Sequence, residues 1–235
     1  MTRADGRQYN ELRDVTITPN FNKFAEGSVL IRCGDTVVLC TASVEERVPP
    51  HVKPGCGWVT AEYSMLPRAN RQRSRRDVDK LKLSSRSAEI QRLIGRSLRA
   101  AVDMQLLGER TVTIDCDVLQ GDGGTRTASV TGGFVALALA CQWLVKEGYK
   151  HYVAGVSAGI VDNTAVLDLP YSEDSRAQVD LNCIMNEQGE IIEIQGTGEG
   201  RAFTVTEQQE LVALCAKGNR ELIAKQKEIV GDILR

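Results

Sequence analysis

Acidic side chains around residue 175 are the first candidates for acid or metal chemistry. Glu173 and Asp174 are adjacent in a short polar segment, and Asp180 lies within an apolar run. A carboxylate inside an apolar strand needs a partner, and Mg²⁺ binds one or two carboxylates together with waters and phosphate oxygens. These three carboxylates are therefore candidates for acid chemistry or for a site in which a pair of them binds Mg²⁺. Turn formation is the alternative role for Asp174, and Asp115 with Asp117 is a competing acidic pair.

A glycine-rich segment, Gln120-Gly-Asp-Gly-Gly-Thr-Arg-Thr127, follows a predicted strand and precedes a predicted helix. Backbone N–H groups at a helix start favour an anion, and glycine permits its close approach. Arg126 adds a fixed positive charge beside Gly124 and Thr125. The segment predicts a phosphate site, although a purely structural turn is the commoner use of such glycines. It lacks the Walker A pattern, which disfavours a nucleoside triphosphatase.

Basic side chains are concentrated between residues 68 and 99. This stretch holds eleven Lys and Arg against three Asp and Glu, a net of +8, whereas the whole chain has a net charge of −2. Arginine forks bind phosphates well, and like charges this close repel one another in a compact fold. A solvated basic loop is the alternative interpretation. We expect this stretch to contact a polyanion, and its densest part comprises Arg71, Arg73, Arg75 and Arg76.

Composition excludes several other classes of protein. With 235 residues and 42% apolar side chains, the chain exceeds the size of a small stapled scaffold. Seven cysteines without a C-x-x-C pair indicate reduced, buried thiols. His51 and His151 are the only histidines, which excludes a metal site built from several histidines. Nothing near the N-terminus resembles an export signal, so a cytoplasmic location is expected.

Hydrophobic periodicity predicts the elements that position these residues. Residues 28–33 and 36–44 read as a hairpin, 58–65 as a further strand that continues this meander, and 86–107 as one amphipathic helix. Residues 111–119 alternate as a strand that places Asp115 and Asp117 on one face. The uncharged stretch 127–145 is predicted as a buried core helix in preference to a membrane span, because Thr, Ser and Gly fill its first third.

The second half of the chain repeats part of this pattern. A hairpin is predicted from residue 153 around Asp162-Asn163, strands at 177–185 and 190–195, and helices over roughly 206–234. The segments around Gly34-Asp35 and Asp162-Asn163 resemble each other. The chain is therefore predicted to be one α/β domain over residues 1–235, with two pseudo-repeated halves of a duplicated βαβα unit, although hairpin chemistry alone can produce so weak a repeat.

Long segments of the chain also resemble the ribonuclease PH family of phosphorolytic exoribonucleases. The match runs nearly end to end, and its most specific segments are 3–7 (RADGR), 25–30 (AEGSVL), 38–46 (VLCTASVEE), 57–63 (GWVTAEY), 65–68 (MLPR), 89–99 (EIQRLIGRSLR), 114–120 (IDCDVLQ), 122–129 (DGGTRTAS) and 173–175 (EDS). A match over so many segments is highly specific to this family.

The resemblance implies a function and a role for individual residues. It implies the α/β fold of ribosomal protein S5 domain 2 and a nucleotidyltransferase that trims tRNA precursor 3′ ends with inorganic phosphate, with a further role in rRNA processing. Phosphate is implied at Arg86, Gly124, Thr125 and Arg126, and acid and Mg²⁺ chemistry at Asp174 and Asp180. Arg68, Arg73 and Arg76 are implied as tRNA-binding. A cytoplasmic homohexamer, a trimer of dimers, is implied, with no membrane partner.

Two other classes of function compete with this interpretation. A non-catalytic RNA-binding ring subunit would be free to lose the Gly-Thr-Arg segment and the carboxylate pair, both of which this chain retains. A small-molecule kinase on a similar fold is disfavoured because the nucleotide phosphate loop is missing. Polynucleotide phosphorylase and archaeal exosome catalytic subunits are closer neighbours, and the full-length match favours the ribonuclease PH family over both.

Overall fold

The computed structural model describes residues 3–76 and 84–234. Its first sheet has five strands in the spatial order β1-β2-β3-β5-β4, namely β1 (Val15–Pro19), β2 (Gly27–Cys33), β3 (Thr36–Glu45), β5 (Thr111–Gln120) and β4 (Trp58–Met65). The second has four in the order β7-β6-β8-β9, namely β7 (Thr164–Leu167), β6 (Val153–Val161), β8 (Val179–Asn186) and β9 (Ile191–Gly198). The mixed α/β class is confirmed.

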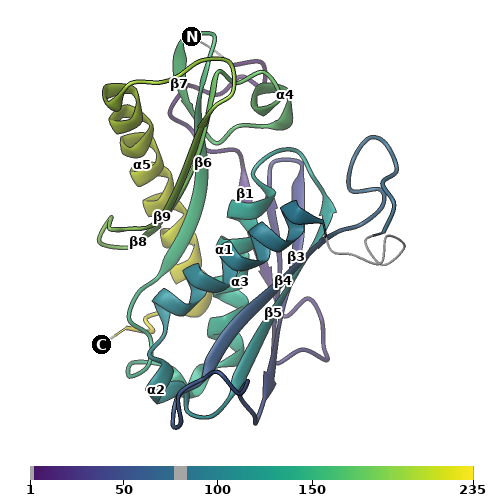
Figure 1. The fold of residues 1–235 in the computed structure, drawn as a ribbon, viewed down its shortest axis with the longest axis vertical. Helices are drawn as coiled ribbons and strands as arrows, with labels where there is room; N and C mark the ends of the chain where they lie inside the picture. Colours follow the sequence, from purple (N-terminus) through teal and green to yellow (C-terminus); the bar gives the residue numbers. More distant parts are fainter. Residues whose placement is uncertain (1–2, 77–83, 235) are drawn as a thin grey trace.

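Helices separate and cover the two sheets. They are α1 (Ser85–Ala101), α2 (Met104–Leu107), α3 (Thr125–Ala140), α4 (Tyr171–Asp174) and α5 (Val205–Val230), with a 3₁₀ turn at Gln142–Leu144. Figure 1 shows α5 against the second sheet and α3 near the centre of the molecule. The first half therefore runs from strands β1–β4 through α1 and α2 to β5 and α3, and the second from β6 and β7 through α4 to β8, β9 and α5. This is the predicted βαβα order; the duplication itself remains a prediction.

The predicted hairpins are both present. Cys33 pairs with Thr36 across the first turn, and Val161 pairs with Thr164 across the second. Asp162 and Asn163 have φ angles of 49° and 58°, a left-handed conformation that Asp and Asn tolerate better than most residues. The two hairpins are extended differently, because β5 pairs with β3 in the first sheet, whereas β8 pairs with β6 in the second.

The prediction that β4 continues the opening meander is wrong. Strands β1, β2 and β3 are consecutive antiparallel neighbours, but β4 pairs in parallel with β5 at the sheet edge. A parallel partner requires a long crossover, and α1 supplies it between β4 and β5. Strand β1 lies before the first predicted strand and was not anticipated from periodicity.

The predicted helix at 86–107 is also corrected, because it is interrupted. Its apolar stripe is buried as expected, but α1 ends at Ala101 and Val102 is extended, where it bridges to Tyr149. The carboxylate of Asp103 then accepts hydrogen bonds from the N–H groups of Gln105 and Leu106 and starts α2. An Asp at this position favours a new N-cap over continuation of the helix.

Helix α3 is buried almost completely, which explains its lack of charge beyond Arg126. It contacts β2 and β3 on one side and β6 on the other. A Cβ at Gly132 would lie 2.8 Å from Ile31 Cγ2, so glycine allows the close helix–sheet approach that the small residues predict. Six of the seven cysteines are buried and all are free thiols. Within the described ranges, no helix has the length and apolar character of a membrane span.

Candidate active site

One cavity of about 850 Å³ brings together all six predicted phosphate and carboxylate residues. Arg86 lies at the start of α1, Asp174 at the end of α4 and Asp180 on β8. The remaining three, Gly124, Thr125 and Arg126, form the start of α3. Residues from both halves of the chain therefore line a single cavity.

The start of α3 has the geometry of an anion site. Gly123 and Gly124 have φ angles of 77° and 66°, and a Cβ on Gly123 would collide with the carbonyl of Leu169. Gly124 is the N-cap and provides no side chain to accept from the first N–H groups of the helix. These groups are left for a ligand, and the helix dipole favours a negative one.

Arg126 is oriented by two residues that the sequence interpretation did not assign. Its Nη1 donates to Gln195 Oε1 at 2.7 Å and to Glu89 Oε1 at 3.2 Å. Gln195 Nε2 donates to the same Glu89 oxygen at 2.9 Å. Arg86 is exposed and makes no ion pair within the part of the chain that the structure describes. The cavity thus contains the guanidinium of Arg126, which Gln195 and Glu89 fix in place, and the guanidinium of Arg86, which is exposed and can contact a ligand.

Thr125 is also fixed in place, by a hydrogen bond with a residue of another element. Its Oγ1 lies 2.8 Å from the hydroxyl of buried Tyr63 on β4. Burial raises the pKa of Tyr63, so it remains a neutral phenol at physiological pH. In the sequence, Tyr63 stands out only as a polar group on an otherwise apolar face of its strand. This does not identify Thr125 as its hydrogen-bond partner.

Asp174 and Asp180 form the acidic side of the cavity. Burial raises the pKa of Asp180 to about 6, and the charge of Asp174 adds to this effect. Asn182 Nδ2 donates to Asp180 Oδ2 at 3.1 Å. Burial also raises the pKa of Asp174, although the charges of Arg86 and Arg126 oppose the shift. Two carboxylates that repel each other in one cavity attract a proton or a cation.

Glu173 does not belong to this acidic pair. It is 4% exposed and accepts from Arg3 Nε at 3.0 Å. The competing pair also lies elsewhere: Asp115 and Asp117 are half-buried on the other face of β5, beside Glu62, and do not line the cavity. Neither Glu173 nor the Asp115–Asp117 pair therefore lines the cavity at the start of α3.

Asp174 and Asp180 fit a Mg²⁺ ion that keeps part of its water shell. The described ranges contain no group of three or more His, Cys, Asp or Glu side chains that could enclose a metal. Mg²⁺ does not require such a cage, since one or two carboxylates with waters and phosphate oxygens suffice. The neighbouring anion site would supply the phosphate oxygens.

The predicted basic segment emerges beside the glycine turn. Arg68, Arg71, Arg73, Arg75 and Arg76 are all exposed and make no ion pair with another described residue. The carbonyl of Ala69 accepts from the N–H of Gly121 at 2.8 Å, which ties the segment to the turn. Figure 1 shows the chain after β4 projecting from the body of the molecule. Lys80 and Lys82 lie outside the described residues.

Part of the basic excess between residues 68 and 99 has a structural use. Arg96 pairs with Glu193, with 3.0 Å between Nε and Oε2. Arg99 donates to the carbonyl of Val59 at 2.7 Å, and its guanidinium lies 4.3 Å from the ring centre of Trp58. These two arginines support the fold, whereas the five exposed arginines of the basic segment remain available for a ligand.

Comparison with known proteins agrees with this geometry. Two family models match, described as 3′ exoribonuclease family domain 1 over residues 11–141 and domain 2 over residues 151–218. A protein of Moorella thermoacetica named Ribonuclease PH is 54% identical, covering 99% of this chain and 96% of its own. Another Ribonuclease PH, from Syntrophomonas wolfei, is 53% identical, covering 98% of this chain and 100% of its own.

Solved structures share the fold. Rice (Oryza sativa) Rrp46 has a TM-score of 0.82 at 16% identity, over 97% of this chain and 100% of that one. A chain of an archaeal exosome core has a TM-score of 0.78 at 25% identity, over 96% and 91%. The Archaeoglobus fulgidus exosome, solved with RNA in its active site, gives 0.81 at 26% identity, over 95% and 92%. With the family model and the near full-length relatives, these findings establish that the chain belongs to the 3′ exoribonuclease family.

Proposed function

We propose that this protein is a phosphate-dependent 3′-5′ exoribonuclease that removes nucleotides from tRNA precursor 3′ ends and contributes to rRNA processing. The observation that carries the proposal is the cavity in which an uncapped helix start and two arginines face two carboxylates. Such a cavity binds an anion on one side and, on the other, holds a proton or a cation.

The cationic side of the cavity binds the nucleophile. Inorganic phosphate would be held by Arg86, Arg126 and the N–H groups at the start of α3. It attacks the last phosphodiester of the RNA in line, forming one P–O bond as the bond to the 3′ oxygen breaks. The products are a shortened RNA and a nucleoside 5′-diphosphate. Because one phosphate linkage replaces another, the reaction is reversible, which accounts for a nucleotidyltransferase activity.

The acidic side of the cavity serves the leaving group. Asp180 is the residue that we assign to protonate the departing 3′ oxygen, because its pKa of about 6 lies closer to neutral pH than that of an ordinary carboxyl. Asp174 keeps a second negative charge beside it. When bound through Asp174, Mg²⁺ would supply positive charge next to the reacting phosphates while Asp180 carries the proton.

The proposed RNA site is the exposed basic segment beside the glycine turn. The hydrogen bond between Ala69 and Gly121 keeps this segment beside the turn that begins α3, which supports the proposal that its arginines contact the backbone of a tRNA precursor or another structured RNA. Backbone contacts of this kind provide affinity with little sequence readout. We further propose that the protein is a cytoplasmic homohexamer, a trimer of dimers. The solved chains that it resembles are subunits of exosome assemblies, and this resemblance supports a ring-shaped oligomer.

Removing charge from this segment should weaken RNA binding without affecting chemistry on a short RNA. Replacing Arg71, Arg73, Arg75 and Arg76 with Gln should reduce the slope of log K against log salt by about 0.7 to 0.9 for each RNA phosphate that the variant no longer neutralises. Fluorescence anisotropy with a labelled tRNA precursor at several salt concentrations measures this slope. The control replaces four exposed basic residues elsewhere: Arg47, Lys53, Arg176 and Arg220. Equal slopes in the two variants would exclude the segment as the RNA site.

The proposed reaction is tested by identifying its products. The protein is incubated with a tRNA that carries extra 3′ nucleotides, with and without inorganic phosphate, and the released nucleotides are separated by ion-exchange chromatography. Nucleoside diphosphates that form only with phosphate are expected. Monophosphates, or activity that is indifferent to phosphate, would contradict phosphorolysis. Binding without any turnover would favour the non-catalytic ring subunit instead.

A further inference from the structure

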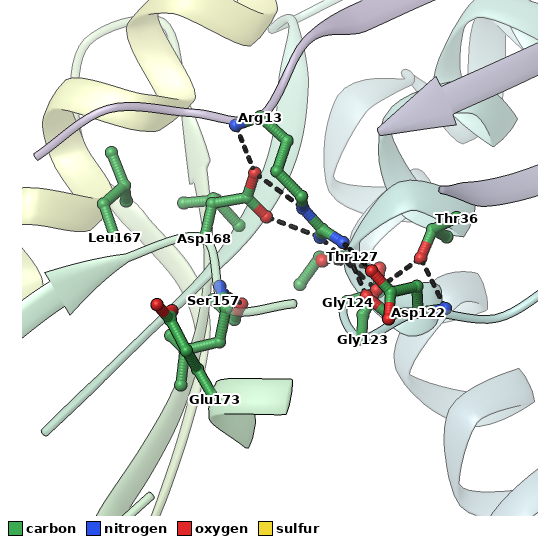
Figure 2. A network of polar contacts seen from close by, with 12 residues as sticks. Arg13, Thr36, Asp122, Gly123, Gly124, Thr127, Ser157, Leu167, Asp168 and Glu173 are labelled. Atoms are coloured by element: carbon green, nitrogen blue, oxygen red, sulfur yellow. Dashed lines mark hydrogen bonds and ion pairs between the residues drawn. The ribbon is translucent and has the colours of Figure 1, made fainter. Parts of the chain in front are cut away.

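Arg13 lies outside the cavity but is bonded to the turn that begins α3. Its side chain is 6% exposed. Nη1 donates to the carbonyl of Asp122 at 2.6 Å, and Nη2 donates to the carbonyl of Gly123 at 3.3 Å. Figure 2 shows the guanidinium between this turn and Asp168. Arg13 does not line the cavity, so it does not itself contact a ligand bound there.

Asp168 fixes the orientation of this guanidinium. Its Oδ1 accepts from Arg13 Nη2 at 2.7 Å, and its Oδ2 accepts from Nε at 3.1 Å and from the backbone N–H of Arg13 at 2.8 Å. Burial alone would raise the pKa of Asp168, but the charge and hydrogen bonds of Arg13 lower it below the usual value. The ionised pair therefore joins the segment before β1 to the end of β7, and through Arg13 to the turn.

Thr36 holds the same turn from the first sheet. Its Oγ1 donates to the carbonyl of Gly123 at 2.7 Å and accepts from the N–H of Asp122 at 2.9 Å. The turn contains two consecutive glycines with positive φ angles, and such a segment has many accessible conformations when nothing restrains it. Arg13 and Thr36 supply that restraint (Figure 2).

These contacts determine where the N–H groups of the turn point. In a trans peptide the C=O and the following N–H point in opposite directions, and none of the described peptide bonds is cis. Holding the carbonyls of Asp122 and Gly123 therefore fixes the N–H vectors of Gly123 and Gly124. It also fixes the residue from which α3 starts, whose N-terminal amides form the anion site.

We propose that Arg13 is a positioning residue for inorganic phosphate: with Asp168 and Thr36 it holds the 122–124 turn so that the start of α3 binds the co-substrate. The inference rests on the proposed function, because phosphate is the ligand assigned to that helix start. RNA binding depends on a different segment and is not affected by Arg13. The contribution of Arg13 is therefore specific to one of the two substrates.

The test is Arg13→Lys, which keeps the charge beside Asp168 but loses the planar fork that bonds Asp168 and two carbonyls together. The KM for phosphate is expected to rise about ten- to a hundredfold, because misplaced amides bind the anion poorly. The KM for RNA should stay within twofold of that of the parent protein. Hydrogen exchange followed by mass spectrometry should show faster exchange in peptides that span residues 121–127.

Arg7→Lys is the matched control, because the bonds of Arg7 end at Asp5, Glu11 and Asp168 and none reaches the turn. It should leave the KM for phosphate unchanged. Thr36→Val covers the case in which Arg13→Lys fails to fold, since it removes the second restraint at nearly constant volume; it should raise the KM for phosphate in the same direction.

Distinct results would overturn the positioning role and the proposed function. An unchanged KM for phosphate in a folded Arg13→Lys variant would overturn the positioning role. If Arg13→Lys does not fold, an unchanged KM in Thr36→Val would overturn it, as would equal increases in both KM values. If the parent protein shows no phosphate-dependent release of diphosphates, the proposed function itself fails, and exchange at residues 121–127 with added inorganic phosphate still reports whether the turn binds the anion.

Discussion

Replacing Asp180 with asparagine should lower the turnover of an RNA substrate by about a hundred- to ten-thousandfold, the range observed when a general acid is removed. Asparagine at this position can still accept a hydrogen bond from Asn182, but it cannot deliver a proton to the leaving 3′ oxygen. Initial rates with a short RNA at saturating phosphate measure the loss, and anisotropy should show that RNA binding is retained. Asp117→Asn is the control, since Asp117 belongs to the competing pair and lies outside the cavity. If Asp117→Asn abolished turnover and Asp180→Asn did not, the assignment would be reversed.

The same substitution should stabilise the metal-free protein. The pKa of Asp180 is about 6 in the folded state and 3.8 in the reference state, so the folded protein binds the proton more tightly. Stability therefore falls as pH rises from about 4 to 6, and the ionised side chain costs about 3 kcal/mol at pH 7. Urea unfolding with a chelator should show this gain for Asp180→Asn at pH 7 and almost none at pH 4. A destabilised variant at pH 7 would indicate that the carboxylate is well solvated.

Replacing Asp168 with asparagine should destabilise the protein by about 3 to 5 kcal/mol at pH 7, because it deprives the buried Arg13 guanidinium of its closest counter-charge and leaves only Asp122, at 3.9 Å. The pKa of Asp168 is lowered on folding, since attraction to Arg13 outweighs burial. Its contribution is therefore complete above about pH 4 and is lost as pH falls through its folded-state pKa. Urea unfolding at pH 7 and pH 3.5 measures the effect, which should be smaller at the lower pH.

An exposed ion pair provides the comparison for this effect. Asp162 pairs with Arg176 at 2.9 Å, but both side chains are about half exposed, so Asp162→Asn should change stability by less than about 1 kcal/mol. If Asp168→Asn cost no more than Asp162→Asn, the Arg13–Asp168 pair would be contributing no more than an ordinary surface contact.

Periodicity in the sequence was sufficient to predict which faces are buried. The stripe of α1 and the alternation of β5 are both present, because each depends on a local repeat of 3.6 or 2 residues. Periodicity does not specify which strand lies next to which. The edge position of β4 is set by the crossover through α1, which is not a local property. The break at Val102 combines a local signal, the N-cap at Asp103, with a bridge to Tyr149 that is distant in sequence.

The candidate site shows the same division between local and long-range information. The glycine turn and the carboxylates were recognisable because their residue types are unusual in their segments. Their partners were not, since Glu89, Gln195 and Arg13 are ordinary residues whose importance depends on the tertiary contact they make. A buried charge requires a partner, but the sequence does not show where along the chain that partner lies.

The bond between Arg13 and Asp168 also has a consequence for the order in which the protein matures on the ribosome. Asp168 is made 155 residues after Arg13, and Glu173 is made 170 residues after Arg3. A nascent chain that has released α3 but not yet β7 carries the glycine turn without the counter-ion that keeps Arg13 in place. Contacts so distant in sequence form late in folding. The phosphate-binding turn is therefore completed only when the second half emerges, so a truncated translation product has all the arginines of the site but not their arrangement.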